Sequence, residues 1–327
     1  MACLLIAVIQ QNTSNLARLA NVLDLACKKE SRYKRLQRFC REAVLDADCL
    51  ARLIMAVARP AGKYVLALDR TEWRYGTVWV NILTLSIVVG KTSIPIYWQT
   101  LNRKGNSTLG EREKLINRYL RTFGVGQLEY LTADREFDSY QFIKYLKDQK
   151  VNFRMRVRIS MAVSKADGKK IKFGKMLRQM TVGEQFKTRK ARKYGEVKVF
   201  FEMEKGIDDK SNVIVISSER SGQILTEYKR RWAIETLFQN LKSRGFELEE
   251  THLRKAERID KLFGILAVAV AWAIKTGEME NEQNPVKIKN HGRPQKSLFR
   301  LGCEVLQEIL MEVTSYSKID IFSILKC

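Results

Sequence analysis

Apolar and polar residues follow helical spacing in the first part of the chain and change to strand-like runs after Pro60. Residues 14–59 carry apolar residues three and four positions apart, which predicts helices. From Lys63 onward, runs rich in valine, isoleucine and threonine predict three consecutive strands, with a turn at Gly90-Lys91. The chain is therefore expected to begin with a helical region and to continue into an antiparallel meander.

Helices and strands alternate after this meander. Thr108 and Glu111 have the spacing of a capping box, and Gly124 follows the last periodic residue, so the segment between them is predicted to be helical. A strand, a second helix and another strand follow up to residue 158. The order of three strands, helix, strand, helix and strand predicts a mixed α/β sheet with helices on its faces.

The remaining segments complete a predicted organisation in five parts. Short strand-like pieces predict a β-rich insertion distinct from the sheet that it interrupts, and the apolar residues 211–218 predict a strand that returns to the main sheet. The apolar run 262–274 is too short to span a membrane and predicts a buried core helix, followed by a polar linker at 276–290 and a final amphipathic helix. The expected parts are a helical region at 1–60, the first part of the α/β domain at 61–158, the basic insertion at 159–210, the rest of the α/β domain at 211–275, and a basic linker with a helix at 276–327.

The charge of the chain points to a polyanionic partner. A net charge of +23 over 327 residues creates a strong positive field, so nucleic acid is the first candidate and an anionic membrane surface the second. The basic residues are spread over strand-like segments instead of one amphipathic helix, so no membrane partner is expected. Two histidines and six cysteines without a Cys-x-x-Cys pair argue against zinc or a disulfide framework. The short N-terminal apolar run lacks a basic region before it, and the predicted location is the cytoplasm.

Two segments concentrate the positive charge. The helical region contains seven Lys or Arg against one Glu in KKESRYKRLQRFCR, where Lys34 and Arg35 are candidate DNA contacts. Residues 154–198 contain fifteen Lys or Arg against three Asp or Glu, with Arg189, Lys190 and Arg192 as candidate contacts. Each segment is either a solvated charged surface or a platform for a nucleic-acid backbone, and the density of one sign favours the second interpretation for the insertion.

A stripe of ionisable residues marks the segment 226–252. Its members are spaced three, four and seven residues apart, and they are Tyr228, Arg231, Glu235 and Lys242. On one helix turning about 100° per residue they fall within roughly 60° of arc. An apolar stripe that must face a core runs beside them, formed by Ile234, Leu237, Phe238 and Leu241. The alternative is a solvated helix face with an accidental spacing.

Three carboxylates are candidate metal ligands. Asp69 and Asp134 each follow an apolar strand-like run, and Glu235 belongs to the ionisable stripe. A lone aspartate after a strand is commonly a turn or cap residue, but three acids without histidine or thiolate partners form a hard oxygen site suited to Mg²⁺ or Mn²⁺. Two such ions would support phosphoryl transfer. In a strongly basic chain, this set predicts chemistry on phosphodiesters.

Three motifs carry a resemblance to a known family. LALDRTEW around Asp69, LTADREF around Asp134 and the Y-x₂-R-x₃-E-x₆-K pattern starting at Tyr228 resemble the DDE transposases of bacterial insertion sequences, in the branch with the Tyr-Arg-Glu-Lys signature (the insertion-sequence-four family). The resemblance covers about residues 60–300. It implies an RNase H-like fold of the retroviral-integrase type, a β-rich insertion before the catalytic glutamate, and cut-and-paste movement of DNA.

The resemblance also implies roles for individual residues and partners. It makes Asp69, Asp134 and Glu235 the catalytic metal ligands, with about two Mg²⁺ or Mn²⁺ ions per site. It assigns contacts with the phosphates of transposon-end DNA to Tyr228, Arg231 and Lys242. The implied partners are double-stranded DNA with terminal inverted repeats, target DNA, and a second copy of the chain on paired ends. A bacterial cytoplasmic protein associated with the nucleoid is expected.

One departure from the family and two alternatives stay open. Relatives carry a tryptophan on the strand before the signature, but this chain has none between Trp98 and Trp232. Trp232 either stacks on a base or packs into the core. The alternatives to a transposase are an RNase H-like nuclease without strand transfer and a catalytically silent, transposase-derived DNA-binding protein. The presence of all three acids argues against the silent protein.

Overall fold

The computed structural model describes residues 1–23, 27–165, 167–290 and 292–315, which belong to two compact units. The helical unit comprises Met1–Arg59, Tyr75–Val78 and Phe238–Cys327, and its residues 316–327, part of the predicted C-terminal segment, lie outside the described residues. The sheet unit comprises Pro60–Arg74 and Trp79–Leu237.

The sheet unit is built on one long mixed sheet. Its strands follow the order β3-β2-β1-β4-β5-β11-β10-β8, and β9 pairs with β10. Their bounds are β1 (Tyr64–Tyr75), β2 (Val78–Val89), β3 (Thr92–Leu101), β4 (Leu128–Ala133), β5 (Phe153–Arg156), β8 (Gln185–Lys187), β9 (Arg192–Tyr194), β10 (Val197–Glu204) and β11 (Val213–Ser217). The three consecutive strands β1, β2 and β3 form the expected meander, and Gly90 has the positive φ of 55° that its tight turn requires.

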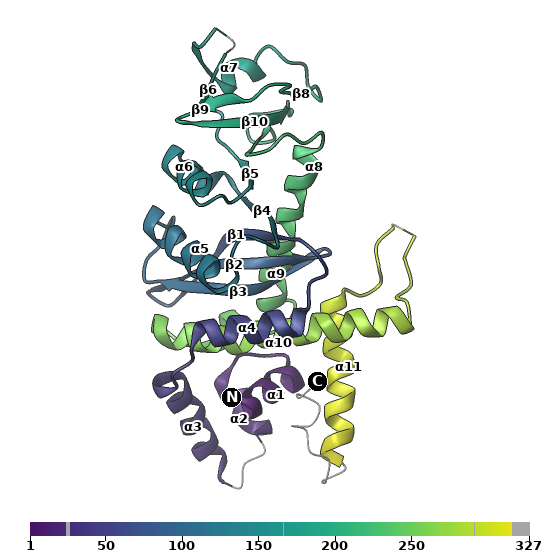
Figure 1. Ribbon diagram of the computed structural model, residues 1–327. Coiled ribbons are helices and arrows are strands. Elements are labelled where there is room, and N and C mark those ends of the chain that lie inside the picture. The colour runs from purple at the N-terminus through teal and green to yellow at the C-terminus, as the bar shows by residue number, and fades with distance from the viewer. Residues whose placement is uncertain (24–26, 166, 291, 316–327) are drawn as a thin grey trace. The chain divides into compact units, whose positions relative to one another are not determined.

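Parallel pairing in the middle of the sheet depends on two helices. β4 lies parallel to β1 and to β5, so each connection must cross over through a helix. These helices are α5 (Leu109–Phe123) and α6 (Tyr140–Asp148), and in Figure 1 they lie to one side of the strands. The capping box of Thr108 and Glu111 is present at the start of α5, as predicted. The mixed α/β sheet expected from the sequence is confirmed.

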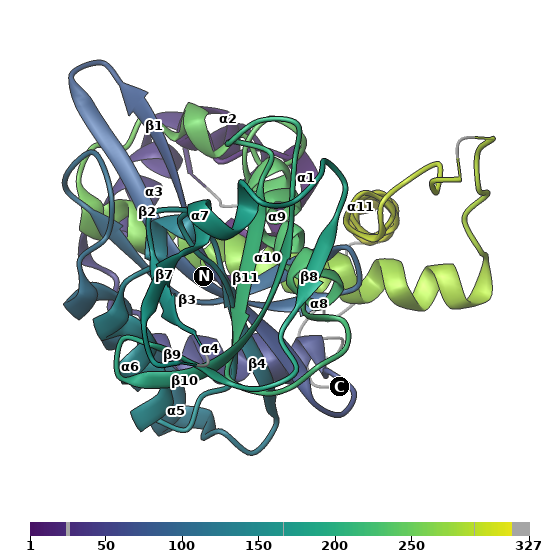
Figure 2. The same ribbon diagram turned by 90° about the horizontal axis from the view of Figure 1, so that it is seen from above.

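The basic insertion differs from the expectation of a separate sheet. β10 pairs with β11, which pairs with β5, so the long strand of the insertion extends the main sheet; Figure 2 shows β10 and β11 side by side. A separate two-stranded sheet is formed by β6 (Ala162–Ser164) and β7 (Lys170–Lys172), followed by α7 (Phe173–Leu177). β10 satisfies the backbone groups of β11 that would otherwise form an open sheet edge.

The helical unit packs around one buried helix. Its helices are α1 (Ala2–Gln11), α2 (Leu16–Val22), α3 (Lys29–Glu42), α4 (Ala47–Ala58), the 3₁₀ turn η3 (Leu248–Thr251), α10 (Ala256–Gln283) and α11 (Leu298–Ser315). This confirms the helical N-terminal region. α10 is long and apolar enough to cross a membrane by composition, but 72% of its most apolar window is buried inside the protein, as in a core helix.

α10 and α11 cross at two glycines, and α10 is longer than expected. A Cβ atom at Gly277 would lie 1.9 Å from the carbonyl oxygen of Leu298, and one at Gly302 would lie 1.7 Å from that of Ala273, so only glycine allows this approach. The polar linker expected from residue 276 is helical up to Gln283, because Glu, Met and Gln are good helix formers. Pro285, two residues after the helix ends, cannot continue it.

Candidate active site

Asp69 and Asp134 occupy adjacent positions in the parallel register of β1 and β4. Leu68 pairs with Ala133, and the two aspartates follow directly. Asp134 leaves the sheet at the end of β4, as expected, and precedes the 3₁₀ turn η1 (Arg135–Phe137). The expectation that Asp69 also ends a strand is wrong, because β1 continues beside β2 as far as Tyr75. The register still brings both carboxyl groups to one place on the sheet.

The side chain of Arg231 joins two of the three predicted acids. Its Nη1 donates to Asp69 Oδ2 at 2.9 Å, and its Nη2 donates to Glu235 Oε1 at 2.6 Å. The arginine side chain is only 6% exposed. A buried guanidinium requires compensation of its charge, and these carboxylates supply it through charge-assisted hydrogen bonds.

Tyr228 brings the third acid into the same network. Its hydroxyl donates to Asp134 Oδ1 at 3.0 Å and accepts a hydrogen bond from Arg231 Nε at 3.0 Å. Tyr228 is itself buried. We call the set of Asp69, Asp134, Tyr228, Arg231 and Glu235 the acid network. The structure thus connects all three predicted acids with two of the three other signature residues.

Burial differs strongly among these groups and shifts their pKa values. The side chain of Asp69 is 15% exposed, whereas that of Glu235 is 51% exposed. Burial raises the pKa of Asp69 to about 7, although Arg231 acts in the opposite direction. Burial also raises the pKa of Tyr228 well above its usual range. For Arg231, burial opposes the charge, but Tyr228 and the neighbouring carboxylates hold the pKa above its ordinary value.

The segment that carries Tyr228, Arg231, Glu235 and Lys242, called the signature segment, is not the single helix predicted from the spacing of these residues. It consists of α8 (Ile224–Tyr228), the 3₁₀ turn η2 (Lys229–Arg231) and α9 (Trp232–Leu241), drawn in green in Figure 1. Lys242 follows the end of α9, belongs to the helical unit and forms an ion pair with Glu249 at 2.8 Å. The tighter 3₁₀ turn changes the angle between successive side chains, so a stripe calculated for one α-helix does not apply across it.

Buried polar contacts from three strands hold α8 in place. Arg154 on β5 forms an ion pair with Glu227, and the hydroxyl of Tyr130 on β4 donates to the backbone oxygen of Glu227. Glu202 on β10 accepts a hydrogen bond from the backbone N–H of Leu225 at 3.1 Å. Because Glu227 precedes Tyr228 directly, these contacts fix the position from which the tyrosine reaches Asp134.

Sequence reasoning missed the arginines of β5. Arg154 and Arg156 stand at alternate positions of the apolar strand FRMR, and Nη1 of Arg156 lies 3.8 Å from Asp134 Oδ1. The signal was available, since two cations spaced two residues apart share one face of a strand, and a buried sheet face tolerates them only with partners.

The carboxylates of the acid network are donors of the type that a hard divalent cation prefers, but they are not arranged around a common metal position. Carboxylate oxygens are the donors that Mg²⁺ and Mn²⁺ prefer. Among the described residues, no three His, Cys, Asp or Glu side chains are grouped so that they could hold a metal ion. The hydrogen bonds of Arg231 account for this, because the guanidinium lies between Asp69 and Glu235 and balances their charge.

The other predicted DNA contacts lie on exposed parts of both units. Lys34 and Arg35 are exposed on α3 of the helical unit. In the sheet unit, Arg189 and Lys190 are exposed in the bend between β8 and β9, and Arg192 is half-buried at the start of β9. These positions leave the charged groups accessible, and their contacts with DNA stay predictions.

Trp232 follows the acid network in the sequence and is exposed. Its exposed fraction is 54%, so the alternative in which it packs into the core is wrong. The exposed indole is accessible to a base, and its stacking on DNA stays a prediction.

The comparison with protein families decides what kind of domain carries this network. The model of the Transposase DDE domain matches residues 60–272. The chain belongs to this family. The matched residues of this DDE domain include all three acids and the whole Tyr-Arg-Glu-Lys signature. Membership of the family implies transposase-type processing of DNA and a divalent metal as cofactor.

Two further comparisons add no argument about function. Among solved structures, the chain is similar to the NurA nuclease from Sulfolobus solfataricus, with 11% sequence identity, a TM-score of 0.28, and coverage of 78% of this chain and 95% of that chain. A TM-score this low supports no inference about shared structure or activity. The search of curated proteins gave no match.

Proposed function

We propose that this DDE-domain protein is a DNA transposase of the insertion-sequence-four branch, with an RNase H-like catalytic domain. In the proposed reaction, water attacks a phosphodiester at the transposon end, and the freed 3′-hydroxyl then attacks target DNA. The observation that carries the proposal is the acid network, in which Tyr228 and Arg231 join Asp69, Asp134 and Glu235 within one unit. The parallel register of β1 and β4 supports the proposed fold.

The three carboxylates are proposed to hold two Mg²⁺ or Mn²⁺ ions. When bound, such ions activate the attacking oxygen and stabilise the leaving oxygen. Before they bind, Arg231 reduces the repulsion between the acids that it joins, since like charges close together raise each other's pKa. Tyr228 orients the carboxyl group of Asp134 through its hydrogen bond. The exposed Glu235 is the acid most free to change its rotamer.

Contacts with DNA are proposed for the signature residues and the basic surfaces. A guanidinium matches the two oxygens of a phosphate, so Arg231 is proposed to contact the DNA end once it is released from Asp69 and Glu235, with Tyr228 and Lys242 as further contacts. The net charge of +23 supports binding of double-stranded transposon ends and target DNA. Two copies of the chain on paired ends, in the bacterial cytoplasm and at the nucleoid, complete the proposal.

The decisive experiment is Mg²⁺-dependent cleavage of DNA that carries the element's own ends. The wild-type chain is compared with Glu235→Ala, and Glu308→Ala serves as the matched control because Glu308 is an exposed glutamate of α11, outside the matched domain. We expect cleavage by the wild type and the control and none by Glu235→Ala, with DNA affinity unchanged in all three.

The same substrates separate the alternatives. Joining of cleaved ends to a second duplex supports a transposase, whereas cleavage without joining supports an RNase H-like nuclease. Binding without cleavage in Mg²⁺ or Mn²⁺ would identify a catalytically silent DNA-binding protein and contradict the proposal. In that case the Asp134→Ala variant would behave like the wild type in both the binding and the cleavage assay.

A further inference from the structure

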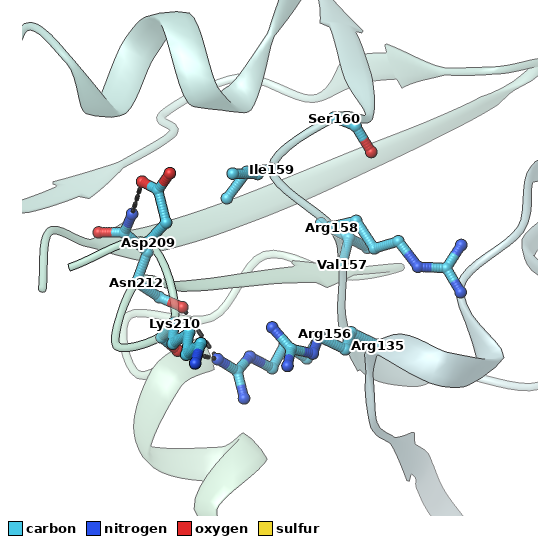
Figure 3. A pocket seen from close by; sticks show the side chains of 9 residues that line it. All are labelled: Arg135, Arg156, Val157, Arg158, Ile159, Ser160, Asp209, Lys210 and Asn212. Atoms are coloured by element: carbon cyan, nitrogen blue, oxygen red, sulfur yellow. Dashed lines mark hydrogen bonds between the residues drawn. The ribbon is translucent and has the colours of Figure 1, made fainter.

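A polar cavity lies beside the acid network, in the loop after β5. Its volume is about 370 Å³, within the range of small-molecule sites. Its lining comes from η1, from β5 and the loop that follows it, and from the loop before β11, and consists of Arg135, Arg156, Val157, Arg158, Ile159, Ser160, Asp209, Lys210 and Asn212. Figure 3 shows Asp209 and Lys210 on one side, Arg158 and Ser160 on the other, and Arg156 with Arg135 between them.

Cations outnumber acids around this cavity. Arg135, Arg158 and Lys210 are exposed, and within the described part of the chain none of their side chains forms an ion pair. The one carboxylate in the lining, Asp209, accepts a hydrogen bond from Asn212 Nδ2 at 3.2 Å. Asp138 partly balances the charge of Arg158, but the remaining like charges around this concave site repel each other and focus a positive field into it, which an anion relieves.

Arg156 forms the wall between the cavity and the acids. One of its nitrogens, Nη2, donates to the backbone oxygens of Lys210 at 3.2 Å and Asn212 at 3.0 Å. The other, Nη1, lies 3.8 Å from Asp134 Oδ1. Only the guanidinium of Arg156 therefore lies between the cavity and a predicted metal ligand. Because this distance is short, a DNA strand bound at the acids can continue past Arg156 into the cavity.

We propose that this cavity binds a phosphate of the DNA strand next to the phosphate that reacts at the acids, with Arg135, Arg158 and Lys210 as its cationic contacts. This inference rests on the proposed function. The cavity is larger than a lone phosphate requires and accommodates the sugar attached to it. Arginine pairs with phosphate through two parallel hydrogen bonds, and Lys210 adds a mobile point charge from the opposite side.

The test removes one phosphate charge from the DNA at a time. Duplexes of the transposon end carry a single neutral methylphosphonate at successive positions around the cleavage site, and their affinity for the full chain is measured. We expect one position near the cleavage site to lose about tenfold in wild-type affinity, because a hydrogen-bonded charge contact is lost. The double variant Arg158→Ala, Lys210→Ala should show the same loss on unmodified DNA and no further loss at that position.

A matched control removes two charges elsewhere on the sheet unit. Arg121 on α5 and Lys147 on α6 are exposed and outside the cavity, so Arg121→Ala, Lys147→Ala should keep the wild-type methylphosphonate profile. Identical profiles for the wild type and the cavity variant would overturn the inference, even where Mg²⁺-dependent cleavage is intact. A methylphosphonate position that weakens DNA binding by the wild type but not by the cavity variant, found in a protein that cleaves no DNA, would support the phosphate site and contradict the proposed transposase activity.

Discussion

The guanidinium of Arg231 donates a hydrogen bond to the carboxylate of Asp69 across 2.9 Å. A second nitrogen of the same arginine donates to Glu235, so one buried cation serves two predicted metal ligands. A divalent ion at these carboxylates would require the same oxygens. Arg231 and the metal ion therefore share ligands, and the arginine should weaken metal binding while it stabilises the metal-free protein.

Arg231→Gln should lower the stability of the metal-free protein and increase its response to Mg²⁺. Loss of the cation leaves Asp69 buried without its ion-pair partner, which costs about 3 kcal/mol of unfolding free energy. The freed carboxylates should bind Mg²⁺ more tightly, and tighter binding to the folded state raises the melting temperature further. Calorimetry at pH 8 measures both effects; this pH lies above the pKa of about 7 that Asp69 has beside Arg231 in the wild type.

The neighbouring arginine provides the control for this change. Arg230 is exposed and forms an ion pair with Glu129 at 3.1 Å, away from the acids of the network. Arg230→Gln should leave both the stability and its Mg²⁺ response close to those of the wild type, because exposed ion pairs contribute little. An equal Mg²⁺ response in Arg231→Gln and the wild type would show that the arginine and the metal do not compete.

Arg154→Met should destabilise the sheet unit and misplace Tyr228. Arg154 is buried over the ring of Tyr130, 4.7 Å from its centre, and forms an ion pair with Glu227. Its removal should cost about 3 kcal/mol in chemical denaturation, because Glu227 is left without its cation. Since Glu227 precedes Tyr228, DNA cleavage should fall more than DNA binding. Loss of stability without this separate loss of cleavage would limit Arg154 to a structural role.

Much of the sheet and the identity of the candidate acids could be predicted from local patterns. The apolar run before Asp134 ends where the strand ends, and the capping box of Thr108 marks the start of α5, because both signals lie within a few residues. The spacing of four residues between Arg231 and Glu235 also predicts that their side chains lie on one face, and the two form a hydrogen bond.

The features that were missed depend on contacts between distant segments. The residues after Asp69 read as polar, yet they continue β1 because β2 lies beside them. β10 joins the main sheet through pairing with β11, and strand pairing of this kind depends on tertiary context. The break of the signature segment at Lys229–Arg231 accompanies the contacts of Tyr228 and Arg231 with acids on other strands, which the segment's own sequence does not contain.

Stability should depend on pH through Glu111 at the start of α5. Hydrogen bonds from Arg103 hold the pKa of Glu111 at about 2, below its ordinary value of 4.5. A lowered pKa in the folded state adds stability that is present above about pH 4.5 and is lost as the pH falls towards 2. In denaturation curves, the difference in unfolding free energy between the wild type and Glu111→Gln should therefore become smaller on acidification. The difference between the wild type and Arg103→Gln should change in the same way. A difference in unfolding free energy that does not change with pH would contradict this role of the ionised Glu111.

Charge reversal in the bend between β8 and β9 should weaken DNA binding. Arg189 and Lys190 are exposed there, while Arg192 is half-buried at the start of β9, so the first two should dominate the effect of a triple change to Glu. Each lost phosphate contact lowers the slope of log K against log salt by about 0.9, because fewer counterions are released. Reversal of Lys114 and Arg121 on α5 perturbs the overall field without these contacts, so it should change affinity less and leave the slope intact. If the triple variant also kept the wild-type slope, the bend would be a solvated surface that DNA does not contact.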